Sequence, residues 1–252
     1  LTRFAASRSL LDALHFSVAS AVEGLQSAAT ADEPLRVMVV GDSTSVILAN
    51  AIHQAAPGRV SVMWVGGNGC PFVEVDAIRS SVDEPWAPPW CHPTDEIVAE
   101  QLAPFRPDVV ILMVCFAELR HQRYFGDDGD HVAGDAQYTQ EHDEYMVAFL
   151  ELLASNGAPL MVADCPQLHE TNVVNAEMAD PARITAWNAQ ISRWVDSSGD
   201  VALLPYAAAI TDRQLANPRE QVLVDGVHAD NQILTEIVRT ELLDLIIAAA
   251  AG

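Results

Sequence analysis

Val37-Met38-Val39-Val40-Gly41-Asp42-Ser43 is the most informative stretch of this chain. Four consecutive apolar residues are typical of a strand that is buried on both faces, as in a parallel sheet covered by helices. Gly41 allows a tight turn directly after this strand. Residues 43–56 then read as a helix, so the chemistry-bearing Asp42 and Ser43 are expected at the junction between a buried strand and a helix.

The same alternation of strand and helix continues to the C-terminus. It predicts a three-layer α/β/α sandwich with a five-stranded parallel sheet and right-handed crossovers, a flavodoxin-like arrangement. In such sheets the ligand site lies beyond the carboxyl ends of the strands. The further strands are expected at 60–65, 109–114, 160–163 and 201–204, and the further helices at 94–105, 139–155, 181–195 and 231–249.

The length of 252 residues fits one α/β domain of ordinary size. Apolar residues at helical spacing between residues 8 and 27 are followed by the polar break Ala31-Asp32-Glu33-Pro34. We therefore expect an N-terminal helix or linker over residues 1–30 and one catalytic-type domain over residues 31–252.

The charge of the chain excludes several classes of partner. Acidic residues number 35 against 13 basic ones, a net charge of −22, and all the basic residues are arginine. Such a surface repels phosphate backbones and anionic lipids, so neither nucleic-acid binding nor docking on a membrane surface is expected. Without lysine, Walker-type phosphate binding and Schiff-base chemistry are excluded.

The apolar runs are too short to span a bilayer, and no signal peptide is recognisable. We expect no membrane insertion by this chain, although its first residue, Leu1, leaves room for an upstream membrane domain.

The four cysteines fall into two pairs of different character. Cys115 and Cys165 lie in or beside apolar runs and are expected to be buried thiols. Cys70 and Cys91 flank a segment rich in proline and tryptophan, and in an oxidising compartment they are expected to form a disulfide.

Ser43 is the candidate nucleophile. At the N-terminus of a helix, free backbone N–H groups and the helix dipole stabilise developing negative charge, which an attacked ester carbonyl requires. The alternative interpretation is that Ser43 only caps the helix, a common role of serine.

A second signal, Asp225-Gly226-Val227-His228, precedes the last predicted helix. A serine hydroxyl needs a base, and histidine is the usual one near neutral pH. Asp225, three residues before His228, can reach the other imidazole nitrogen and fix its tautomer. A solvated surface histidine is the alternative interpretation.

Together, Gly41-Asp42-Ser43 and Asp225-x-x-His228 resemble the first and last blocks of the SGNH (GDSL-type) hydrolases, over roughly residues 35–250. The resemblance implies Ser43, His228 and Asp225 as the catalytic residues, and the N–H groups of Ser43 and Gly69 as oxyanion donors. The family's donor asparagine is replaced by Ala117. Residues expected to surround the site or line the substrate are Asp42, Asn68, Ala117, Glu118 and Asp164.

The implied function is that of a serine esterase or deacylase that cleaves a short-chain or O-acetyl ester of a small molecule or glycan, without metal or cofactor. Transfer of the acyl group from Ser43 to an acceptor other than water is the alternative. A non-catalytic binding domain is another, because of Ala117. The pattern also resembles SGNH domains fused to bacterial membrane acyltransferases, which implies a site outside the cytoplasm.

A further cluster of histidines and aspartates is a weak candidate for a metal site. His121, His131 and His142 lie in sequence near Asp127, Asp128 and Asp130, but their spacing matches no ligand pattern. We expect a solvated acidic loop there rather than a metal site.

Overall fold

The computed structural model describes residues 34–85 and 94–251, so the helix predicted within residues 1–30 lies outside the described residues. The described part contains a five-stranded parallel sheet in the order β2-β1-β4-β6-β7. The predicted fold class is therefore confirmed. The strands are β1 (Leu35–Gly41), β2 (Val60–Gly66), β4 (Val109–Met113), β6 (Leu160–Ala163) and β7 (Val201–Leu204).

β1 lies between β2 and β4, and its carboxyl end forms part of the edge on which the site is built. Gly41, its last residue, lies level with Gly66 of β2 and with Met113 of β4. At both glycines a Cβ would overlap a neighbouring backbone oxygen, that of Met113 for Gly41 and that of Gly41 for Gly66. The missing side chains thus let three strand ends come close together, and the loops that follow them share one edge.

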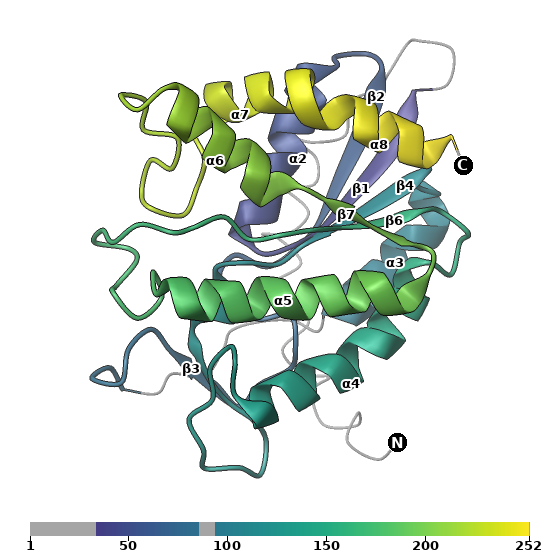
Figure 1. Ribbon diagram of the computed structural model, residues 1–252. Coiled ribbons are helices and arrows are strands. Elements are labelled where there is room, and N and C mark those ends of the chain that lie inside the picture. Colours follow the sequence, from purple (N-terminus) through teal and green to yellow (C-terminus); the bar gives the residue numbers. More distant parts are fainter. Residues whose placement is uncertain (1–33, 86–93, 252) are drawn as a thin grey trace, which may run out of the picture.

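Helices cover both faces of the sheet (Figure 1). One layer contains α2 (Ser43–Ala55), α6 (Tyr206–Ala216), α7 (Asn231–Ile237) and α8 (Leu243–Ala250), with a π-helical turn at Val238–Leu242. The other contains α3 (Thr94–Phe105), α4 (Ala136–Leu153) and α5 (Pro181–Ser198).

The two cores follow from the alternation of side chains along a strand. Val37 and Val39 of β1 pack into the core under α2. Met38 and Val40 pack into the core under α4 and α5, and all four side chains are fully buried. A continuous apolar run is what a strand between two helical layers requires.

Two short strands were not predicted from the sequence. β3 (Ala77–Arg79) and β5 (His121–Arg123) form an antiparallel pair outside the main sheet. α6 was also not predicted. Its first turn depends on Asp164, far away in sequence, whose carboxylate accepts the N–H of Ala207 at 2.7 Å. Among the described helices, none is both long enough and apolar enough to cross a membrane.

The prediction of free thiols at Cys115 and Cys165 is wrong, because these residues form a disulfide with a Cα–Cα distance of 5.2 Å. They follow β4 and β6, which are neighbours in the sheet, so parallel pairing brings their backbones within bonding range. Cys70 is also disulfide-bonded. Cys91, its predicted partner, lies outside the described residues.

Candidate active site

Ser43 occupies the first position of α2, immediately after the turn that ends β1. Gly41 has a φ of +147°, a backbone conformation that residues with a side chain rarely adopt. The turn is therefore possible only with glycine, and it directs Ser43 to the carboxyl edge of the sheet. The N–H groups in the first turn of a helix have no partner within the helix.

Asp42, which lies between Gly41 and Ser43 in the chain, is almost fully buried and acts as the N-cap of α2. Its Oδ1 accepts the N–H of Thr44 at 2.8 Å. Its Oδ2 accepts the N–H groups of Ala117 at 3.1 Å and Cys115 at 3.3 Å. Burial raises the pKa of Asp42, although these hydrogen bonds oppose the shift. Asp42 therefore joins the start of α2 to the turn after β4 rather than facing a substrate.

His228 lies between Ser43 and Asp225. Its Nε2 is 2.8 Å from the Oγ of Ser43, and its Nδ1 is 2.7 Å from the Oδ2 of Asp225. Residues that are 185 positions apart in the chain are thus within hydrogen-bonding distance. Because a carboxylate only accepts, Nδ1 carries the proton, which leaves Nε2 of the neutral ring free to accept the serine proton.

Hydrogen bonds within the loop stabilise the segment that carries Asp225 and His228. The N–H of Val224 donates to the carbonyl of His228 at 2.8 Å, and Oδ1 of Asp225 accepts the N–H groups of Val227 and His228 at 3.0 and 2.8 Å. Burial alone would raise the pKa of Asp225. The hydrogen bonds from the His228 side chain and from the two N–H groups outweigh it, so the pKa of this carboxyl lies below its ordinary value.

The loop after β6, which the sequence did not single out, forms hydrogen bonds to the loop that carries Asp225 and His228. The hydroxyl of Thr171 donates to the carbonyl of Asp225 at 2.5 Å, and the N–H of His169 donates to the carbonyl of Gly226 at 3.2 Å. Gly226 has a φ of +89°, and a Cβ there would overlap the carbonyl oxygen of His169. No sequence pattern could reveal this role of Thr171 and His169, since their contacts with Asp225 and Gly226 join segments that are far apart in the chain.

The predicted oxyanion donors lie in two loops at this edge. Gly69 follows β2 with a φ of +67°, and open space surrounds the position of its absent side chain. Within residues 34–85 and 94–251, neither its N–H nor that of Ser43 has a hydrogen-bond partner. Both groups are therefore available to an acceptor such as a substrate oxygen, and their role as donors stays a prediction.

The other predicted neighbours divide by environment. Asn68 is exposed beside Gly69. Ala117 is fully buried, and its N–H is bound to Asp42. Glu118 is fully buried beside His142, and Asp164 contacts α6 as described above. Within the described part of the chain, Ala117, Glu118 and Asp164 therefore have defined structural contacts, whereas the side chain of Asn68 is exposed.

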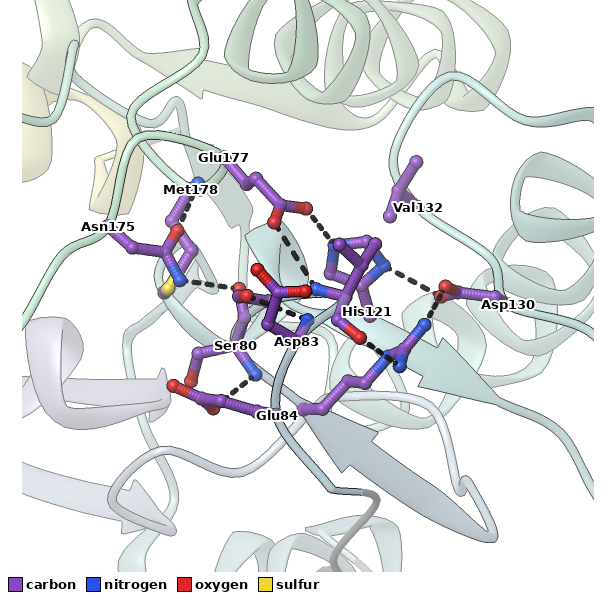
Figure 2. A network of polar contacts seen from close by, with 12 residues as sticks. Ser80, Asp83, Glu84, His121, Asp130, Val132, Asn175, Glu177 and Met178 are labelled. Carbon is purple, nitrogen blue, oxygen red and sulfur yellow. Dashed lines mark hydrogen bonds and ion pairs between the residues drawn. The ribbon is translucent and has the colours of Figure 1, made fainter.

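The histidine and aspartate cluster does not form one site. His131 pairs with Asp127 at 2.7 Å. His121 lies between Asp130 and Glu177, at 2.7 and 2.6 Å (Figure 2). The expectation of a solvated acidic loop is therefore wrong for His121, which is nearly buried, and for His142, which lies inside α4. Among the described residues, no group of three or more such side chains has an arrangement that could hold a metal ion.

The network of Figure 2 joins loops that follow β2, β4 and β6. Glu177 contacts His121 of β5 and also accepts the N–H of Val82 at 3.2 Å. Asn175, in the same loop as Thr171, donates to the carbonyl of Ser80 at 2.7 Å. The segment that supports Asp225 is therefore itself anchored at its far end.

Comparison with known proteins gives a family and a fold. A family model described as "SGNH domain (fused to AT3 domains)" matches residues 15–227. A candidate acylhydrolase from Bacteroides fragilis has a TM-score of 0.60 at 12% identity, covering 94% of this chain and 97% of that one. A GDSL-like lipase from Bacteroides thetaiotaomicron has a TM-score of 0.56 at 13% identity, with coverages of 85% and 88%.

A carbohydrate acetylesterase family member from Sinorhizobium meliloti has a TM-score of 0.51 at 14% identity, with coverages of 86% and 100%. At such identities the structural likeness shows the fold alone. No curated protein matches the sequence.

Proposed function

The chain belongs to the SGNH domain family, which confirms the predicted class of an SGNH-type hydrolase, and we propose that it cleaves an acyl ester through an acyl-enzyme on Ser43. The observation that supports this proposal most directly is the pair of contacts made by His228, 2.8 Å to Ser43 and 2.7 Å to Asp225. A serine, an imidazole and a carboxylate in this order are the elements of nucleophilic acyl transfer.

In the first half of the proposed reaction, the Oγ of Ser43 attacks the acyl carbonyl while Nε2 of His228 takes its proton. The carbonyl oxygen becomes an oxyanion, which the N–H groups of Ser43 and Gly69 stabilise by hydrogen bonding. The intermediate then expels the alcohol, which receives its proton from His228. The acyl group remains on Ser43 as an ester.

In the second half, His228 takes a proton from water, and the resulting hydroxide attacks the acyl group. A second tetrahedral intermediate collapses, Ser43 regains its proton from His228, and the carboxylic acid leaves. Asp225 accepts the Nδ1–H of His228 throughout and stabilises the imidazolium that forms in each half.

We propose a short-chain or O-acetyl ester of a small molecule or glycan as the substrate. The description of the family as fused to AT3 domains favours a second candidate function, in which an acceptor hydroxyl takes the place of water. Hydrolysis and transfer share every step up to the acyl-enzyme. They are separated by measuring acetylated acceptor against free acetate when candidate sugars are added.

Ser43→Ala tests the nucleophile. We expect turnover of 4-nitrophenyl acetate to fall to background, because removing a catalytic serine typically costs several orders of magnitude in kcat. A fluorophosphonate probe should modify the parent at Ser43 and leave the variant unmodified. Ser192→Ala, an exposed serine on α5, is the matched control and should behave like the parent. Retained activity in Ser43→Ala would remove Ser43 from the mechanism, and a parent that is not labelled would favour a binding domain.

A further inference from the structure

A carboxylate and an imidazole that the proposed reaction does not use lie in the core beside the site. Glu118 and His142 have fully buried side chains, and Oε2 of Glu118 is 2.7 Å from Nε2 of His142. Gln122 donates to the same oxygen at 2.9 Å, and the hydroxyl of Tyr138 lies at 3.2 Å. Oε1 accepts the backbone N–H of Phe72 at 2.5 Å.

The contacts indicate that Glu118 is ionised. The N–H of Phe72 donates to Oε1 and the side-chain amide of Gln122 donates to Oε2, so both oxygens act as acceptors. Burial would raise the pKa of Glu118, but His142 and the hydrogen-bond donors outweigh it and lower the pKa. Burying a carboxylate has a desolvation cost, so stability alone does not explain its presence here.

The contact with Phe72 links this pair to the loop after β2. Phe72 follows Gly69 by three residues, and its ring packs edge-on against Tyr145 and Phe149 of α4, with centroids 4.8 and 4.9 Å away. The hydrogen bond to Glu118 therefore fixes the backbone of the loop, while the ring fixes its position over α4.

Ala117, the residue before Glu118, links the same turn to the start of α2. The N–H of Ala117 is bound to Asp42, which caps the helix that begins at Ser43. The turn after β4 thus contacts the Ser43 side of the site through Ala117 and the Gly69 side through Glu118. The backbone N–H groups of Ser43 and Gly69 are the two donors that we propose for the oxyanion.

We infer that Glu118 is a positioning residue, which holds the loop of Gly69 at the correct distance from the N-terminus of α2 through its bond to the N–H of Phe72. In this chain the turn carries Ala117 and no side-chain donor, and its contribution is to set the relative placement of two backbone donors. This inference rests on the proposed function, and it assigns His142 the part of orienting Glu118 through its contact with Oε2.

Glu118→Ala and Glu118→Gln form the central comparison. Alanine removes the acceptor for Phe72, and we expect kcat per labelled active site to fall roughly 10- to 100-fold with little change in KM. Glutamine retains one acceptor oxygen, and its kcat should stay within about threefold of the parent. The inhibition constant of a trifluoromethyl ketone, which forms a tetrahedral adduct with serine, should rise by the factor by which kcat/KM falls.

A second variant guards against misfolding. Glu118→Met/His142→Leu replaces the pair by apolar side chains of similar volume, which favours a folded protein. It also removes the acceptor for Phe72, so kcat should fall as in Glu118→Ala. Ile191→Ala, a cavity variant in the same core on α5, controls for lost stability and should keep its kcat per labelled site.

Hydrogen exchange of peptides covering residues 66–72 reads the position of the loop without relying on activity. Faster exchange in Glu118→Ala and in the double variant, but not in Glu118→Gln or Ile191→Ala, is the expected result. Equal exchange in all variants, or an unchanged kcat in both variants that lack the acceptor, would overturn the inference. A parent that neither turns over ester nor reacts with fluorophosphonate would instead overturn the proposed function, and the exchange data would still test the positioning.

Discussion

In the proposed mechanism Asp225 orients His228, and its carboxylate also makes a pH-dependent contribution to stability. Its pKa is held below the ordinary value by hydrogen bonds that outweigh burial. A carboxyl whose folded pKa is depressed contributes stability above its unfolded pKa and loses that contribution as the pH falls through the folded pKa. The contribution is therefore complete at neutral pH and declines in acid.

Asp225→Asn should show both effects. The variant loses the acceptor that fixes the proton on Nδ1 of His228, and kcat at neutral pH should drop by on the order of 10³–10⁴, as in other triads. The difference in unfolding free energy between parent and variant should be constant from about pH 5 to 8 and shrink below about pH 4. Urea unfolding at several pH values measures it. A difference that grows towards low pH would contradict the assignment.

For single residues, the sequence revealed partners only where they lie close together in the chain. Asp225 and His228 are three residues apart, and Gly41 adjoins Ser43 through Asp42, so each pattern was visible as a short motif. The partnership of Glu118 with His142 was not visible, because it joins a turn to a helix 24 positions later. The buried thiols predicted at Cys115 and Cys165 were wrong for a similar reason.

At the scale of elements, strands and helices were predictable where one segment carries its own signal. The expected helix over 94–105 has the observed bounds of α3, and the acidic residues Asp95 and Glu96 mark its first turn. α6 was missed because Asp164 completes its first turn from another loop. β3 and β5 were missed because strands of three residues depend on each other for their pairing.

The loop between Leu223 and Ala229, which carries Asp225 and His228, depends on one glycine. Gly226→Ala should destabilise the protein by about 1–2 kcal/mol for the left-handed backbone. Its Cβ would also meet the carbonyl of His169, so the loop must shift, and kcat should fall by roughly 10². Kinetics per labelled site, together with urea unfolding, measure the two effects separately.

Gly199→Ala provides the matched control for this variant. Gly199 also has a left-handed backbone, with a φ of +59°, but nothing lies within 4 Å of its added Cβ at the end of α5. It should lose a comparable part of the stability and keep its kcat. If both variants lost activity equally, the contact with His169 would not be the cause.

For the whole molecule, the site depends on the sheet keeping its strand ends in line. Ser43 follows β1, Gly69 follows β2, and the turn with Ala117 and Glu118 follows β4. Parallel pairing brings these ends to one edge, which is why the general rule for ligand sites in such sheets predicts from sequence that these residues lie near one another. The Cys115–Cys165 disulfide adds a covalent link between the segments after β4 and β6.

Cys115→Ala/Cys165→Ala tests this link. The disulfide closes a loop with a sequence separation of 50, and a loop of that size restricts the unfolded chain by about 4 kcal/mol. The double variant should lose a free energy of unfolding of that order in urea without reductant. Adding reductant should destabilise the parent by more than it destabilises the double variant, since the variant retains only the bond of Cys70. Equal urea midpoints for parent and variant would show that the pairing of β4 with β6, and not the covalent bond, holds this edge of the sheet together.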